Sequence, residues 1–252
     1  MRVNQLSNSL VNYVPHYMDQ YNIGDVLSNP LLYFDIKANS PVNIVGGGVW
    51  QYWYDKPNTI YWAPGKSTKN IIDQYKKPKE SLITCSRDID SGLRHVPCVS
   101  VMNKIVDTPI GTESIFVMGN DDTVGFKIPD NMMSVMYTPI KYIDVFSKSN
   151  RISTNSYHAA YWGLLSGRKV RLYGYSSKFV SLLKGFGFTG NEYVRYDKGS
   201  LKSFNQAIRT NTEWLTIDHN HYKIMFREMN LDYASDVAKL KEIDSVTKIG
   251  SH

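Results

Sequence analysis

The stretch RISTNSYHAAYWGLLSGRKVRLYGYSSK, residues 151–178, decides the predicted fold. It contains a short β-prone run at 151–154, a capped helical pattern at 157–166 and a second β-prone run at 169–173. A glycine turn and another helix start follow. This order predicts a parallel sheet whose helix N-termini lie at the carboxyl ends of the strands, which is where open α/β sheets bind ligands.

Polar residues open both of these helices. Asn155 and Ser156 precede the first helix, and Ser176, Ser177 and Lys178 begin the second. Backbone N–H groups at helix N-termini attract anions, and a lysine adds positive charge. We therefore interpret these five residues as binding the phosphates of a donor. The competing interpretation is that the serines and the asparagine only cap their helices.

The net charge of +6 is distributed unevenly along the 252 residues. Residues 141–227 carry 14 Lys and Arg against 5 Asp and Glu, whereas residues 1–140 carry 12 against 13. A polyanionic donor, DNA or an anionic membrane surface would account for a basic segment. A solvated basic face with no dedicated partner is the alternative.

The two cysteines, Cys85 and Cys98, make neither a disulfide framework nor a metal pattern, and we expect reduced, buried thiols. His219 and His221 stand two apart, which is weak support for a metal site, so we predict no metal. The sequence begins without an apolar signal region and has no run of membrane-spanning length. We expect a soluble, cytoplasmic protein.

The first half of the chain contains a strand that runs into three glycines. The strand is predicted at 42–45, and Gly46, Gly47 and Gly48 follow it. Glycines allow a ligand or another chain segment to approach the backbone closely. The spacing matches neither a dinucleotide fingerprint nor a phosphate loop. Another strand, at 81–85, delivers Arg87 to its carboxyl end.

Apolar spacing predicts further helices and strands along the chain. A cluster of Asp, Pro and Gly predicts a domain boundary near 105–125. The predicted strands are 59–62, 96–101, 114–118 and 132–136, and the predicted helices are 26–32, 69–75, 139–146, 180–186, 201–209 and 219–240.

Six short motifs, in the same order along the chain, resemble those of the polysaccharide pyruvyl transferases. They are Asn-Ile-Gly-Asp at 22–25, Ile-Val-Gly-Gly-Gly at 44–48, Trp-Ala-Pro-Gly at 62–65, Ser-Arg-Asp at 86–88, Thr-Asn-Ser-Tyr-His-Ala-Ala at 154–160 and Arg-x-x-Asn-x-x-Tyr at 227–233.

The resemblance implies an α/β fold of the GT-B type, with two Rossmann-like halves facing a central cleft. It implies an acceptor half at 1–115, a donor-binding half at 116–218, and a C-terminal helix at 219–252 that packs back on the first half. The chain is shorter than the usual bacterial members, and Ala63 replaces a glycine of the family's turn. These departures imply an altered acceptor side and a donor that need not be phosphoenolpyruvate.

The candidate catalytic residues are His158 and Asp25. His158 could bind a donor phosphate or act as general acid, or it could simply pack against its aromatic neighbours. Asp25 could remove the acceptor proton, or it could cap the following helix. We assign Gly24, the three glycines 46–48 and Arg87 to substrate binding. For Arg87 the alternative is a surface ion pair with a nearby aspartate.

The predicted function is transfer of a sugar, such as glucose or arabinose, from a nucleotide-sugar donor to a hydroxyl. No cofactor is implied beyond a co-substrate such as a UDP-sugar. The small, basic chain resembles a bacteriophage protein, which favours hydroxymethylcytosine in duplex DNA as acceptor and the host cytoplasm as location. The alternatives are a pyruvyl transferase that uses phosphoenolpyruvate and a non-catalytic nucleic-acid-binding protein.

Overall fold

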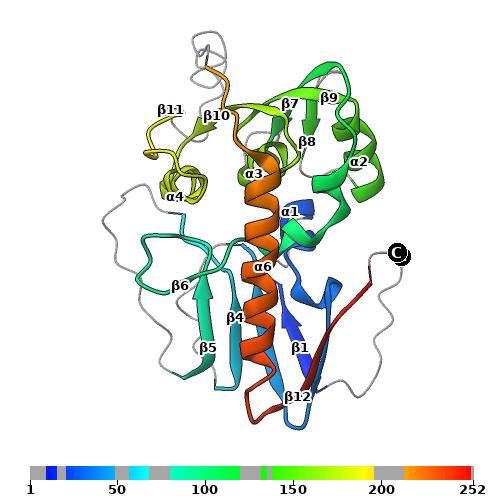
Figure 1. Cartoon of the computed structure of the whole chain (residues 1–252), viewed down its shortest axis with the longest axis vertical. Helices are drawn as coiled ribbons and strands as arrows, with labels where there is room; N and C mark the ends of the chain where they lie inside the picture. The colour runs from blue at the N-terminus through cyan, green and yellow to red at the C-terminus, as the bar shows by residue number, and fades with distance from the viewer. Residues whose placement is uncertain are drawn as a thin grey trace.

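The computed structural model describes residues 10–15, 21–48, 57–67, 80–119, 132–134, 138–195 and 213–250. These residues form an α/β protein with two parallel sheets of five strands each and a separate antiparallel pair. In Figure 1 the two sheets lie one above the other, and the long helix α6 (His219–Val237) runs from one to the other. The predicted fold class, α/β with parallel sheets, is confirmed at this level.

The first sheet has the order β1-β3-β4-β5-β6. Its strands are β1 (Val11–Val14), β3 (Val42–Gly46), β4 (Thr59–Trp62), β5 (Ser81–Ser86) and β6 (Arg94–His95), and all neighbours pair in parallel. The predicted strands at 42–45, 59–62 and 81–85 are therefore confirmed. All four residues of β4 are buried, which explains why its sequence lacks an alternating pattern.

The second sheet has the order β11-β10-β9-β7-β8, again with parallel pairing throughout. Its strands are β7 (Glu113–Met118), β8 (Met132–Ser134), β9 (Ser149–Thr154), β10 (Lys169–Gly174) and β11 (Val194–Arg195), and its helices are α2 (Pro139–Ser147), α3 (Tyr157–Leu165) and α4 (Ser177–Gly185). The β-α-β-α reading of residues 151–178 is confirmed. Every residue of α3 is buried, so this helix lies at the centre of its half.

Two predictions in the first half are wrong. The strand predicted at 96–101 is instead a buried segment without regular structure, followed by the 3-10 helix η2 (Val99–Met102). Pro97 cannot donate a ladder hydrogen bond, and a short apolar run alone does not distinguish a strand from a buried turn. The helix predicted at 26–32 is two pieces, α1 (Ile23–Leu27) and the 3-10 helix η1 (Pro30–Leu32), because Asn29 caps a new turn in front of Pro30.

Other elements were missed or fall outside the description. The antiparallel pair of β2 (Phe34–Ala38) and β12 (Ile243–Lys248) joins segments far apart in sequence and has no local signal, and a further short 3-10 helix, η3 (Lys104–Asp107), follows η2. The helices predicted at 69–75 and 201–209 lie outside the described residues, as do the last two residues of the strand predicted at 132–136.

Helix α6 packs on the cores of both halves. Phe226 belongs to the core that contains α3 and the second sheet, whereas Tyr233 and Val237 belong to the core of the first sheet. Asn230 fixes the crossing point: its Oδ1 accepts a hydrogen bond from Trp62 Nε1 (2.9 Å), and its Nδ2 donates to the carbonyls of Pro97 and Phe226 (3.1 and 3.0 Å). Both Asn230 and Trp62 are fully buried.

We expect Asn230→Leu to destabilise the protein by about 2–3 kcal/mol, because the Trp62 indole N–H would lose its partner in a fully buried site. Glu228→Gln, at an exposed position of the same helix, is the control and should change the free energy of unfolding by less than about 0.5 kcal/mol. Urea denaturation measures both. Equal stability of the two variants would contradict the role given to Asn230.

Candidate functional site

The carboxyl ends of the two sheets meet. Ser67, shortly after β4, lies with its Oγ 2.9 Å from Oγ of Ser176, which follows β10. After β5, the backbone N–H of Ile89 donates to Ser181 Oγ in α4 (3.1 Å). Since ligands of parallel sheets bind at the carboxyl ends of the strands, this junction is where both halves can contribute to one site.

His158 joins the two halves at this junction. It lies in the first turn of α3, and its Nε2 is 3.0 Å from Ser28 Oγ at the end of α1. A Cβ atom placed on Gly24 would lie 2.1 Å from His158 Nδ1, so only glycine lets the ring pack this closely on α1. Both ring nitrogens therefore face α1.

The imidazole of His158 is neutral in this environment. Burial lowers its pKa well below the ordinary value, and the charges of Arg87 and Lys178 lower it further. Ser28 Oγ donates its hydrogen to the carbonyl of Gly24 (2.6 Å), so the Nε2–H of the neutral ring donates to Ser28 Oγ (3.0 Å). His158 thus combines packing against its neighbours with a polar contact across the junction.

Ser28 and Cys98 complete this cluster, and sequence reasoning did not find them as site residues. Cys98 Sγ lies 3.1 Å from Ser28 Oγ and 3.7 Å from His158 Nε2. No spacing rule relates three positions so far apart in the chain. As expected from the sequence, Cys85 and Cys98 are both buried and unbridged.

Asp25 lies in the first turn of α1, where it does not cap the helix. The cap is Asn22, whose Oδ1 accepts from Gly24 N (2.8 Å), so the capping alternative for Asp25 is wrong. Burial raises the pKa of Asp25 from 3.8 to about 6, although the nearby charges of Arg87 and Lys178 act in the opposite direction. A carboxyl group with this pKa is ionised at neutral pH and is basic enough to accept a proton.

Arg87 is buried at the carboxyl end of β5, with only 4% of its surface exposed. Its guanidinium lies 4.1 Å from the centre of the Tyr157 ring, and a Cβ on Gly65 would lie 2.3 Å from its Nε. Within the described part of the chain, Nε and Nη1 are buried and have no hydrogen-bond partner. A desolvated cation with open donors favours an anionic ligand.

The surface ion pair considered for Arg87 does not form. Asp88 Oδ2 instead accepts from the backbone N–H of Lys66 (2.5 Å), and Asp90 pairs with Lys184 (2.5 Å). Burial raises the pKa of Asp88 to about 7, against the hydrogen bonds from Lys66 and Ser181. Asp88 is thus a buried carboxyl group next to Arg87 in the sequence, although sequence reasoning treated it only as a surface partner.

The start of α4 contributes the residues predicted at 176–178. Ser176 occupies the N-cap position but makes no capping bond, and its hydroxyl contacts Ser67 instead. Lys178 Nζ donates to Tyr175 Oη (2.9 Å) and lies 4.7 Å from the centre of that ring. Its charge also acts on Asp25 and His158, so Lys178 belongs to the same electrostatic neighbourhood.

Asn155 and Ser156 have clear structural partners. Asn155 Oδ1 accepts from Gly119 N (2.7 Å), which ties the ends of β7 and β9 together. Ser156 caps α3 by accepting from Ala159 N (3.4 Å). These bonds hold the N-terminus of α3, and with it His158, at the junction.

The glycines 46–48 accommodate another chain segment. A Cβ on Gly47, at φ +63°, would lie 2.1 Å from Ser28 Cβ, and one on Gly46 would lie 2.6 Å from Pro30 Cδ. The carbonyl of Gly48 accepts from Gly65 N (3.1 Å). Of the two uses that the sequence left open, the close approach of a chain segment is therefore observed.

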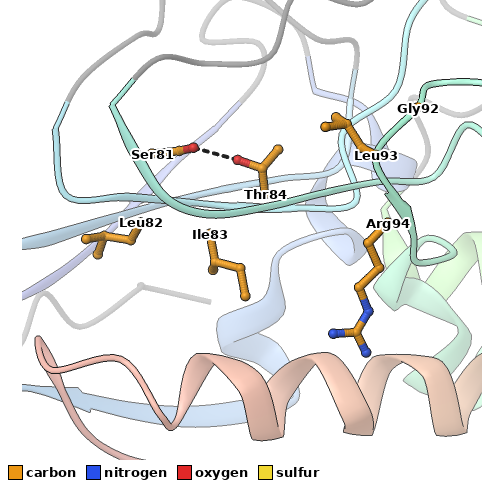
Figure 2. A pocket seen from close by; sticks show the side chains of 7 residues that line it. All are labelled: Ser81, Leu82, Ile83, Thr84, Gly92, Leu93 and Arg94. Atoms are coloured by element: carbon orange, nitrogen blue, oxygen red, sulfur yellow. Dashed lines mark hydrogen bonds between the residues drawn. The ribbon is translucent and has the colours of Figure 1, made fainter.

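One cavity of about 340 Å³ lies away from this junction (Figure 2). It is lined by Ser81, Leu82, Ile83, Thr84, Gly92, Leu93 and Arg94. The β5 residues here precede the carboxyl end of the strand, and Arg94 reaches toward α6, where it pairs with Asp236. With its only charged side chain in that ion pair, the cavity lacks the groups that a transfer reaction needs.

The described residues contain no group of three or more His, Cys, Asp or Glu side chains placed to hold a metal ion. In the same part of the chain, no helix combines the length and the apolar character that crossing a membrane requires.

We expect Gly24→Ala to destabilise the protein by about 1–3 kcal/mol, since the added methyl overlaps the His158 ring. In a His158→Ala background the same change should cost less, giving a coupling energy of about 1 kcal/mol. Gly185→Ala, where an added Cβ meets nothing within 4 Å, is the control and should be neutral or slightly stabilising. Additive costs for Gly24→Ala and His158→Ala would argue against the contact.

We expect Asp25→Asn to be more stable than the wild type by about 1–3 kcal/mol at pH 8. Because folding raises the pKa of Asp25, the ionised carboxylate costs stability above about pH 6, and this cost disappears as the pH falls toward 4. Thermal unfolding from pH 4 to 8 measures the difference. If the stability of the variant relative to the wild type instead increased toward low pH, the raised pKa of Asp25 would be contradicted.

A scan against protein-family models and searches of curated proteins and of solved structures found no match.

Proposed function

We propose that this protein transfers a sugar from a nucleotide-sugar donor to a hydroxyl group at the junction of the two sheets. The observation that carries the proposal is the junction itself, where the carboxyl ends of both sheets meet and the buried Arg87 has open donors. Burial raises the pKa of Asp25 there to about 6, and the charges of Arg87 from the first half and Lys178 from the second act to lower it. A carboxylate that can accept a proton thus lies within the electrostatic influence of two cations that could hold a departing diphosphate.

The architecture that we propose is of the GT-B type, with halves at 1–115 and 116–218 and the segment 219–252 packing back on the first. Two features support it: the carboxyl ends of both parallel sheets meet at one place, and α6 packs on both cores. In such an arrangement residues of both halves can contribute to one site between the sheets.

In the proposed reaction Asp25 accepts the proton of the acceptor hydroxyl while the oxygen of that hydroxyl bonds to the anomeric carbon of the sugar. The bond between that carbon and the diphosphate oxygen breaks, and its electron pair leaves with the diphosphate. Arg87, Lys178 and the N-terminus of α4 stabilise the added negative charge. His158, neutral and facing α1, positions the helix that carries Asp25, so we assign it a positioning role in place of general acid.

Pyruvyl transfer from phosphoenolpyruvate is the second candidate. The open donors Nε and Nη1 of the buried Arg87 favour it, because a compact carboxylate or phosphate would satisfy them both. The same base, Asp25, would serve this reaction, so the donor decides between the two candidates.

For the acceptor we propose hydroxymethylcytosine in duplex DNA. The support is the net charge of +9 over residues 141–227, which contain 14 Lys and Arg and 5 Asp and Glu. A thermal-shift screen against UDP-sugars, phosphoenolpyruvate, and duplexes with and without hydroxymethylcytosine tests the whole proposal. Stabilisation by phosphoenolpyruvate alone would contradict the nucleotide-sugar donor and favour pyruvyl transfer. Stabilisation by DNA with no effect of any donor would indicate a binding protein without transferase activity.

With the donor identified, we expect kcat/KM for transfer to rise with pH and level off above about pH 6, as Asp25 loses its proton. Asp25→Asn should lower kcat by about 10²- to 10⁴-fold with little change in donor affinity. Asp35→Asn, at an exposed site in β2, is the matched control and should leave the rate unchanged. A fully active Asp25→Asn enzyme would remove the base from the mechanism.

A further inference from the structure

A second cavity, of about 330 Å³, lies where the segment connecting the two sheets meets the end of the chain. Its lining residues come from η1, from η2 and η3, from α6 and from β12 with the residues that follow it. They are Leu32, Tyr33, Met102, Asn103, Lys104, Asp107, Arg227, Lys248, Ile249 and Gly250. None of the residues assigned to the transfer reaction lines this connector pocket.

The connector pocket has an excess of positive charge. Lys104, Arg227 and Lys248 line it, and the one carboxylate among its lining residues is Asp107. Asp107 accepts from Arg227 Nη2 (2.5 Å) and from Lys223 Nζ (3.1 Å), which stands beside the pocket. Burial raises the pKa of Asp107, but these hydrogen bonds outweigh it and the pKa lies below the ordinary value.

Asp107 is thus already neutralised, whereas two lysines remain available. Lys104 and Lys248 are exposed, and the structure gives neither of them an ion pair within the described residues. Two lysines beside an arginine already held in place form a site for an anion of more than one charge.

The wall of the connector pocket also offers apolar surface. Leu32 is 45% exposed and Ile249 is 39% exposed, while Met102 is partly buried beside them. The backbone N–H of Ile249 donates to the carbonyl of Tyr33 (2.8 Å), which fixes this part of the chain against η1. Apolar surface next to cations, in a cavity of small-ligand size, suits an anion with an organic body.

We propose that the connector pocket binds a phosphate ester with an organic body, such as a nucleotide. Lys104, Lys248 and Arg227 bind the phosphate, and Leu32, Met102 and Ile249 contact the base or sugar. This site is separate from the transfer site, so the proposed nucleotide binding does not depend on whether the protein is a transferase.

The test uses the full chain labelled with ¹³C at the methionine methyl groups, titrated with AMP, UMP, inorganic phosphate and a short DNA duplex. We expect the Met102 methyl signal, assigned with Met102→Leu, to shift with the nucleotides. In calorimetry, Lys104→Gln combined with Lys248→Gln should weaken nucleotide binding about tenfold or more. Lys37→Gln with Lys241→Gln removes the same charge from exposed sites outside the pocket and should leave the affinity unchanged.

Two further variants locate the site. Asp107→Asn should strengthen nucleotide binding, because it removes the only carboxylate that lines the pocket. Lys178→Gln, which removes a cation assigned to the donor at the transfer site, should leave the Met102 shift unchanged, which separates this site from the transfer site. A Met102 shift that appears at the same nucleotide concentration after the Lys104 and Lys248 changes would overturn the proposal.

The choice of ligand distinguishes the source of the phosphate. Equal affinity for AMP and inorganic phosphate would overturn the role of the apolar wall. Binding of the duplex alone, lost in the Lys104 and Lys248 double variant, would overturn the small-molecule assignment in favour of a backbone phosphate of DNA.

Discussion

The close packing of His158 on Gly24 and Ser28 is the constraint on which the junction depends. A histidine from the second half fills the space that the missing side chain of Gly24 leaves, and its Nε2 meets Ser28 Oγ at 3.0 Å. Ser28 in turn occupies the space left by Gly47. Each of these close contacts is possible only at a glycine. Together they fix α1 against α3. This packing brings Asp25 of the first half near Lys178 of the second.

The charged groups of the junction are held at a cost to stability. Asp25 and Asp88 have pKa values raised by burial, to about 6 and about 7, and the buried Arg87 has donors without partners among the described residues. A fold selected only for stability would replace such groups with apolar residues. Their collection at the carboxyl ends of two sheets is typical of a site that is completed by its ligand.

The parts of the fold that could be predicted have local signals. Residues 151–178 carry caps, a glycine stop and helical spacing, and the structure follows them almost residue by residue. The pairing of β2 with β12 and the cluster of Ser28, Cys98 and His158 join distant segments, which no local pattern reports. His158 and Asp25 were identified as candidates, but the neutral state of one and the raised pKa of the other are consequences of burial, which only the structure provides.

If both halves contact one donor at the junction, binding of that donor should protect backbone amides of both. Hydrogen exchange, with and without the donor found to bind, measures this protection. We expect slower exchange in residues 22–28 and 86–90 of the first half together with 176–182 of the second. Protection confined to one half, or absent from all three segments, would contradict donor contact by both halves.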